Sequence, residues 1–230
     1  MSHYEKAWQA VLARMERAAR AAGRDPAEIR LLAVSKTFAP EAIRAVHALG
    51  QRAFGENYVQ EGIAKIDATA DLAGLEWHLI GPLQGNKARV AAQRFAWVDT
   101  VDRLPIAQRL AAARPDGMPP LNVCVQVNIS GEGSKSGVAP GDAVALACAV
   151  GEVAGLRLRG LMGIAEPTAD ASRQRAQFAS LRRCFDACRA AGLPLDTLSM
   201  GMSADLEAAI AEGATLVRVG TAIFGERPHA

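Results

Sequence analysis

The feature of this sequence that most constrains its fold is a repeated alternation of short apolar runs with helical segments. After an opening amphipathic helix at about residues 3–22, strand-like runs recur with helical patterns between them. The runs lie at residues 29–36, 52–57, 76–83, 97–102, 122–130, 156–164, 197–202 and 215–225. Several are nearly continuous in apolar residues, as burial on both faces of a parallel sheet requires. Eight strand–helix repeats predict an α/β fold, a (β/α)8 TIM barrel with an extra N-terminal helix.

Local signals place several helix ends. Pro40 suits the first turn of a helix that Gly50 ends. Ser172 is expected to cap a later helix that closes at Gly192. The apolar face of that helix consists of Phe178, Leu181, Phe185 and Cys188.

A doubly wound open sheet is the alternative fold. It typically uses fewer strands, and no GxGxxG turn follows the first strand of this chain. A barrel takes up about 200 residues, which leaves little of this chain for a second domain. We therefore expect one domain over residues 1–230.

Charge and cysteine content exclude several classes of protein. Lys and Arg number 26 against 24 Asp and Glu, a net charge of +2 without a charge block, so neither nucleic acid nor a membrane surface is the expected partner. The N-terminal segment carries charges throughout and no apolar stretch is long enough to span a bilayer, which predicts a cytoplasmic protein. The cysteines have no metal or redox spacing and are expected to be reduced, in or near the core. They are Cys124, Cys148, Cys184 and Cys188.

Lys36 is the unusual residue among those at the strand ends, which meet at the functional mouth of a barrel. It follows the run Leu-Leu-Ala-Val-Ser, and desolvation there lowers the pKa of a lysine and favours the free amine that attacks a carbonyl. This is how a Schiff-base lysine is prepared. The alternative is a solvated lysine at the barrel mouth, or one paired with Glu56, which is the commoner fate of a lysine at a strand end.

Two turns near the end of the sequence predict an anion site. The turn Ser199–Ser203 leads into a helix, and Gly220 and Thr221 follow the eighth strand, where barrels commonly hold phosphate. The alternative for the first turn is ordinary capping, with Ser203 as the N-cap. Asp205, at the start of the same helix, would repel a phosphate unless it points away.

An amine opposite a phosphate site predicts a phosphorylated aldehyde or ketone as the ligand. Both a sugar phosphate and pyridoxal 5'-phosphate (PLP) meet that description, and composition does not choose between them. Arg218, if it points inward from the eighth strand, can sit beside a pyridine nitrogen and keep it unprotonated. An ion pair between Arg218 and Asp99 is the alternative.

Several segments of the chain resemble the YggS/PROSC family, the pyridoxal phosphate homeostasis proteins. They are AVSKTF, FGENYVQE, WHLIGPLQGNK, VNISGEGSKSG, GLMGI and SMGMSADLEAAIAEGATLVRVGTAIFG. The resemblance runs from about residue 5 to about residue 226. It implies a single-domain barrel of the alanine racemase N-terminal type, which is fold type III among PLP proteins.

The resemblance also implies roles for individual residues. Lys36 would form the internal aldimine with PLP, Arg218 would approach the pyridine nitrogen, and Asn57 and His78 would lie near the ring. The phosphate would be lined by Ser199, Met200, Gly201, Ser203, Gly220 and Thr221. Position 38, often a second lysine in bacterial members, is a phenylalanine here. Lys135 is then the remaining candidate for a second amine that handles PLP.

The sequence favours a carrier of PLP over an enzyme. Racemisation on the alanine racemase plan needs a tyrosine from a second domain, and this chain offers only Tyr4 and Tyr58. An arginine at the ring nitrogen also weakens the electron sink of the cofactor. We therefore expect a monomer that holds PLP reversibly and supplies it to PLP-dependent apoenzymes. A weak PLP-dependent amino acid racemase and a PLP-free, aldolase-like barrel are the alternatives.

Overall fold

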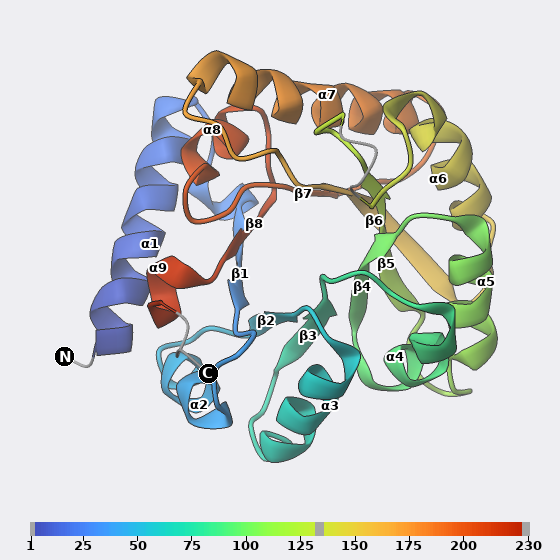
Figure 1. The fold of residues 1–230 in the computed structure, drawn as a ribbon, viewed down its shortest axis with the longest axis horizontal. Helices are drawn as coiled ribbons and strands as arrows, with labels where there is room; N and C mark the ends of the chain where they lie inside the picture. Colours follow the sequence, from blue (N-terminus) through green and yellow to red (C-terminus); the bar gives the residue numbers. More distant parts are fainter. Residues whose placement is uncertain (1–2, 132–135, 227–230) are drawn as a thin grey trace.

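The computed structural model describes residues 3–131 and 136–226, and these form a closed barrel of parallel strands (Figure 1). Each strand pairs with the next along the chain, and β8 pairs with β1 to close the barrel. The strands are β1 (Arg30–Val34), β2 (Ala53–Glu56), β3 (Glu76–Leu79), β4 (Trp97–Val101), β5 (Leu121–Val127), β6 (Leu156–Gly163), β7 (Thr197–Ser199) and β8 (Leu216–Val219). The predicted fold class is confirmed.

Helices lie outside the strands. They are α1 (His3–Ala21), α2 (Pro40–Ala48), α3 (Val59–Ala68), α4 (Ala88–Arg94), α5 (Leu104–Ala113), α6 (Ala143–Gly151), α7 (Ala171–Ala190), α8 (Leu206–Ala211) and α9 (Thr221–Phe224). Short 3-10 turns at Pro26–Glu28, Gly85–Lys87 and Pro140–Asp142 precede β1, α4 and α6. Pro40 occupies the first turn of α2, and Gly192 adopts φ +93° after α7, both as the sequence predicts.

Two local predictions need correction. The run expected to be one strand from residue 215 to 225 ends at Val219 and continues as the short helix α9, because an apolar run has no period that separates a strand from a buried helical turn. The cap of α7 is Asp170 and not Ser172. The carboxylate of Asp170 accepts hydrogen bonds from the backbone N–H groups of Ser172 and Arg173, at 2.8 and 3.1 Å.

The apolar core has two parts. The larger part lies between the strands and the helices, and there Phe178 is fully buried, a contribution of about 1.5–3 kcal/mol for a side chain of this kind. Inside the barrel, smaller groups of apolar side chains fill the interior. They are Leu32, Ala53 and Leu216, and separately Trp97, Cys124 and Met162.

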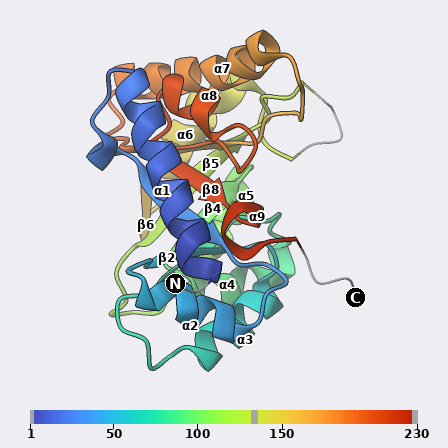
Figure 2. The ribbon, with the colours of Figure 1, turned by 90° about the vertical axis from the view of Figure 1, so that its left-hand side faces the viewer.

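Helix α1 crosses the outside of the barrel beside α8 and α9 (Figure 2). Its Arg14 forms an ion pair with Glu207 of α8 and donates a hydrogen bond to the Ser203 carbonyl at 3.1 Å. Tyr4 packs edge-on against Phe224 of α9. The two ends of the described chain are therefore joined beside the turn that follows β7.

Three further observations concern membrane spans, metal sites and disulfides. Within the described ranges no helix is long and apolar enough to cross a membrane. In the same part of the chain no group of His, Cys, Asp and Glu side chains is arranged to hold a metal ion. All four cysteines are free, as predicted.

Candidate functional site

A cavity of about 330 Å³ opens at the C-terminal ends of the strands. It brings together residues from the ends of β1, β2 and β8 and from the turns that follow β7 and β8. Six of the ten residues proposed from the sequence line it: Lys36, Asn57, Ser203, Arg218, Gly220 and Thr221. The Lys36 amine and the turns after β7 and β8, far apart in the sequence, therefore share one opening.

Lys36 enters the cavity because the side chains of β1 alternate between the two sides of the barrel wall. Val34 and Lys36 both line the cavity, whereas the Ser35 hydroxyl points the other way and donates a hydrogen bond to Glu56 Oε1 at 2.6 Å. The Glu56 carboxylate, offered by the sequence as a partner for Lys36, accepts from Ser35 and from Lys65. Lys36 is half-buried, so its ammonium loses part of its hydration at the cavity wall.

Arg218 is 4% exposed and reaches the cavity from β8. Its Nη1 donates to Ser199 Oγ at 2.8 Å and its Nη2 donates to the Gly163 carbonyl at 2.9 Å. Burial lowers the pKa of Arg218, and the charges of Asp99 and Asp205 oppose that shift. Within the described part of the chain, these two hydrogen bonds take the place of the Asp99 ion pair that the sequence left open. They fix the guanidinium at the cavity wall.

The turns after β7 and β8 are compact at their glycines. Gly201 adopts φ +92°, and a Cβ there would lie 2.5 Å from Ala209 Cβ. A Cβ on Gly220 would lie 3.1 Å from the Val34 carbonyl oxygen. The backbone of both turns can therefore approach β1 and α8 only because no side chain intervenes.

Ser203 and Asp205 divide the roles that the sequence gave to this turn. Asp205, not Ser203, occupies the N-cap position of α8. Its carboxylate accepts a hydrogen bond from the Met202 backbone N–H and is absent from the cavity wall. Burial raises the pKa of Asp205, and the Met202 N–H bond opposes that rise. The Ser203 hydroxyl lines the cavity and accepts from the Ala222 N–H at 3.4 Å, so it links the turn after β7 to α9.

Three residues proposed to line the phosphate lie behind the cavity wall. Ser199 is fully buried and holds Arg218. Met200 is fully buried in the apolar layer between strands and helices. Gly201 sets the course of the turn. Lys135, the candidate second amine, lies outside the described residues.

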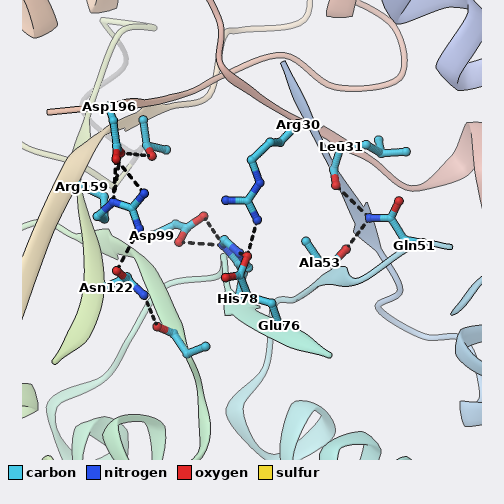
Figure 3. A network of polar contacts seen from close by, with 12 residues as sticks. Arg30, Leu31, Gln51, Ala53, Glu76, His78, Asp99, Asn122, Arg159 and Asp196 are labelled. Atoms are coloured by element: carbon cyan, nitrogen blue, oxygen red, sulfur yellow. Dashed lines mark hydrogen bonds and ion pairs between the residues drawn. The ribbon is translucent and has the colours of Figure 1, made fainter. Parts of the chain in front are cut away.

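His78 is the largest departure from the expected site, because it is fully buried and does not line the cavity. Figure 3 shows it between Asp99 and Glu76. Its ring stacks on Trp97 at 4.7 Å. Nδ1 lies 3.1 Å from Asp99 Oδ2, and Nε2 lies 3.2 Å from Glu76 Oε1, which also pairs with Arg30. We call Arg30, Glu76, His78 and Asp99 the His78 network.

Position along β3 separates His78 from the cavity. Ile80, two residues beyond His78 and on the same side of the strand, lines the cavity, whereas His78 does not. Pairing across the strands does not set a common depth, because Val34 pairs with Gly55 and Gly55 with His78, and Val34 lines the cavity.

Electrostatics in the His78 network favour the protonated imidazole. Burial lowers the pKa of His78, but the charge of Asp99 and the hydrogen bonds to Asp99 and Glu76 outweigh burial, and the net shift is upward. Burial raises the pKa of Glu76, but the bonds and charges of His78 and Arg30 bring it down to about 2. The network is therefore a set of mutually stabilising charges at the base of the barrel.

Apolar residues complete the cavity, and none of them was among the site residues expected from the sequence. They are Val34, Phe38, Ile80, Ile164 and Met202. Phe38 also stacks on Phe224 of α9, with ring centroids 5.2 Å apart. Ile80 lies two residues beyond His78, so strand alternation turns both side chains to the same side of the barrel wall. That spacing is the signal that would have found Ile80.

The fold and the cavity define a class of protein, a (β/α)8 barrel with a lysine amine and a buried arginine at its mouth. The model of the alanine racemase N-terminal domain matches residues 8–228. A pyridoxal phosphate homeostasis protein of Pseudomonas aeruginosa is 60% identical over 219 residues, covering 95% of this chain and 94% of its own length. One of Escherichia coli is 52% identical over 214 residues, covering 92% of each chain. The chain belongs to the alanine racemase N-terminal domain family and, within it, to the pyridoxal phosphate homeostasis proteins.

Two solved structures resemble the chain to different degrees. PipY of Synechococcus elongatus with PLP bound is 40% identical, with a TM-score of 0.80 over 92% of this chain and 99% of that one. The alanine racemase of Clostridium difficile is 16% identical, with a TM-score of 0.75, and matches 95% of this chain but 57% of its own. That second likeness shows the fold alone.

Proposed function

We propose that this chain binds PLP reversibly in the mouth cavity and takes part in intracellular PLP homeostasis. The observation that carries the proposal is that Lys36 shares one cavity with Arg218, Ser203 and Gly220. The names of the relatives, and the PLP bound to a structure 40% identical to this chain, support it. A single barrel domain carries the whole function in this proposal.

The donors around the cavity fit PLP. When bound, PLP supplies an aldehyde that condenses reversibly with a primary amine, with loss of water, and a phosphate that anchors it. Lys36 provides the amine, and Asn57 lies beside it on the next strand. The hydroxyls of Ser203 and Thr221 and the backbone at Gly220 would hold the phosphate, as barrels commonly do after strands 7 and 8.

The buried residues behind the wall have supporting roles in the proposal. Arg218, held by Ser199, would approach the pyridine nitrogen as a cation, which keeps that nitrogen unprotonated. Gly201 and Met200 would shape the turn that carries Ser203. His78 would support the β3 wall from its buried position two residues before Ile80.

We propose a carrier and not a racemase. The curated relatives are named as homeostasis proteins, whereas the racemase shares the fold at 16% identity. Tyr58 is 65% exposed and Tyr4 packs against Phe224, so neither lines the cavity. A cytoplasmic monomer that hands PLP to apoenzymes by transient contact completes the proposal. Incubation with single enantiomers of amino acids tests it, because a loss of optical purity would favour the racemase.

One experiment tests PLP binding directly. Purified protein is mixed with PLP, reduced with borohydride and digested, and the peptides are weighed. We expect the reduced cofactor mass on Lys36, its loss in Lys36→Ala, and its retention in the matched control Lys6→Ala, which removes an exposed lysine of α1. Wild-type protein that captures a ketose phosphate on Lys36 but no PLP would support the aldolase-like alternative instead.

A further inference from the structure

A buried group of polar side chains lies behind Lys36, on the outer side of the barrel wall. We call Ser35, Glu56, Glu61 and Lys65 the Lys65 cluster. The Lys65 side chain, on α3, is 6% exposed. Its Nζ donates to the Ser35 carbonyl at 2.7 Å, to Glu56 Oε1 at 2.8 Å and to Glu61 Oε1 at 2.7 Å. All three donors of this ammonium are used.

The backbone directly after Lys36 is strained. Thr37 adopts φ +71°, and among the described residues it is the sole non-glycine residue with a positive φ. A β-branched residue rarely adopts this conformation, and it persists only where its surroundings hold it. The Thr37 N–H donates to Glu61 Oε1 at 2.5 Å, the same oxygen that accepts from Lys65.

The cluster therefore bonds the main chain on both sides of Lys36. Lys65 holds the carbonyl of Ser35 directly, and through Glu61 it holds the amide of Thr37. Fixing the peptide group before Lys36 and the one after it fixes the direction of the Lys36 Cα–Cβ bond. None of the four members of the Lys65 cluster lines the cavity, so the cluster acts on the aim of Lys36 and not on a ligand.

Burial makes this arrangement more than a surface contact. Burying an ammonium is unfavourable unless it is paired and hydrogen-bonded. Glu56 is fully buried beside Lys65, and Glu61 is partly exposed. The low dielectric around the pair strengthens these hydrogen bonds, so the positions of the bonded groups vary little.

We propose that Lys65, acting through Glu61, is a positioning residue that aims the Lys36 amine into the mouth cavity. The inference rests on the proposed function, in which Lys36 is the amine that meets the aldehyde of PLP. The strained backbone at Thr37 is the conformation that the Lys65 cluster holds. Loss of the Glu61 bond lets the peptide after Lys36 relax and turns the amine away.

The test changes Glu61 and not Lys65. In Glu61 variants Lys65 keeps two of its three partners, the Ser35 carbonyl and Glu56, so we expect the fold to be retained. Glu61→Ala removes the acceptor for the Thr37 N–H, and Glu61→Asp shortens it by one methylene. Glu61→Gln keeps an oxygen at the original reach. The matched control is Glu41→Ala, an exposed acid in the first turn of α2.

Two measurements on PLP-treated protein report on positioning. The first is the rate at which PLP mass appears on Lys36 in a borohydride-quenched time course. The second is the visible circular dichroism per bound PLP, which follows the orientation of the chromophore. We expect Glu61→Ala and Glu61→Asp to slow capture at least about tenfold, since a misplacement of ~1 Å can cost a hundredfold. Both variants should show a weaker visible circular dichroism per bound PLP than the wild type. The midpoints of their urea unfolding curves should not change.

Rescue separates positioning from general stability. Glu61→Gln should restore both readouts, and Glu41→Ala should match wild type. Wild-type rates and dichroism in Glu61→Ala and Glu61→Asp would overturn this inference alone. Absence of PLP mass from Lys36 in the wild type would overturn the proposed function as well.

Discussion

Two buried charged groups serve opposite ends of the barrel, the Lys65 cluster at the mouth and the His78 network at the base. Lys65 holds the main chain around Lys36 from outside the wall. His78 lies inside the barrel and is stacked on Trp97. Figure 3 shows its contacts with Asp99 and Glu76. Both join a cation to two carboxylates, but the Lys65 cluster touches the backbone that carries the amine. Buried charge near a site therefore need not belong to the site.

The two groups also differ in what titrates. The cation of the mouth group is an ammonium, and that of the base group is an imidazolium, whose pKa ordinarily lies close to neutral pH and is raised here, against the effect of burial, by Asp99 and Glu76. Perturbing the two groups separately should therefore give effects that differ in size and in pH dependence.

Lys65→Met should destabilise the protein most. It leaves Glu56 buried beside Ser35 without its cation, and breaking such a pair from one side costs about 3–5 kcal/mol of unfolding free energy. Urea unfolding followed by far-UV circular dichroism measures the change. A loss below about 1 kcal/mol would show that the Lys65 cluster contributes little to stability.

His78→Gln should cost less, about 2–3 kcal/mol of unfolding free energy, because the amide still donates to one of the two carboxylates. Capture of PLP by Lys36 should stay at the wild-type rate, since His78 is fully buried and does not line the cavity. Lys36→Ala is the comparison, with capture abolished. Slow capture in His78→Gln at unchanged stability would place His78 in the site after all.

Stability should fall as the pH rises through the His78 pKa. That pKa is higher in the folded protein than its ordinary value of 6.5, so the folded state binds the proton more tightly. The contribution is complete below about the ordinary value and is lost as the pH passes the raised folded value. Urea midpoints measured from pH 6 to pH 9 should decline in the wild type and less in His78→Gln. Parallel curves would exclude His78 as the source.

The smallest effect belongs to an exposed pair. Arg20 and Glu16 lie one turn apart on α1, with side chains 70% and 52% exposed. Arg20→Met should change the unfolding free energy by no more than about 0.5 kcal/mol, because solvent screens the pair. A loss near that of Lys65→Met would remove the distinction between buried and exposed pairs.

Cavity residues that directly follow a strand could be predicted from the sequence, because position along the strand was enough to find them. Lys36 and Asn57 follow β1 and β2, and both line the cavity. His78 lies within β3, and the sequence pattern does not show that it is buried between Asp99 and Glu76 below the end of that strand.

Lys65 was missed for a different reason. A lysine in a helix is normally read as solvent-exposed, and its partners come from separate elements. The available signal was its spacing from Val59 and Gly62, which places all three on the buried face of α3. The helical turn of α9 was hidden by the apolar run that continues from β8.

The seam between β1 and β8 has a consequence for how the protein is made. Strands β1 and β8 pair with each other, although β1 comes early in the sequence and β8 comes last. Lys36 follows β1, and Arg218 and Gly220 lie in and directly after β8. Near the same junction, Tyr4 and Phe38 pack against Phe224. During translation the amine emerges long before the wall that faces it. Under the proposed function, a polypeptide that stops before Arg218 would carry the Lys36 amine without the residues that face it, and PLP capture would wait until β8 has docked.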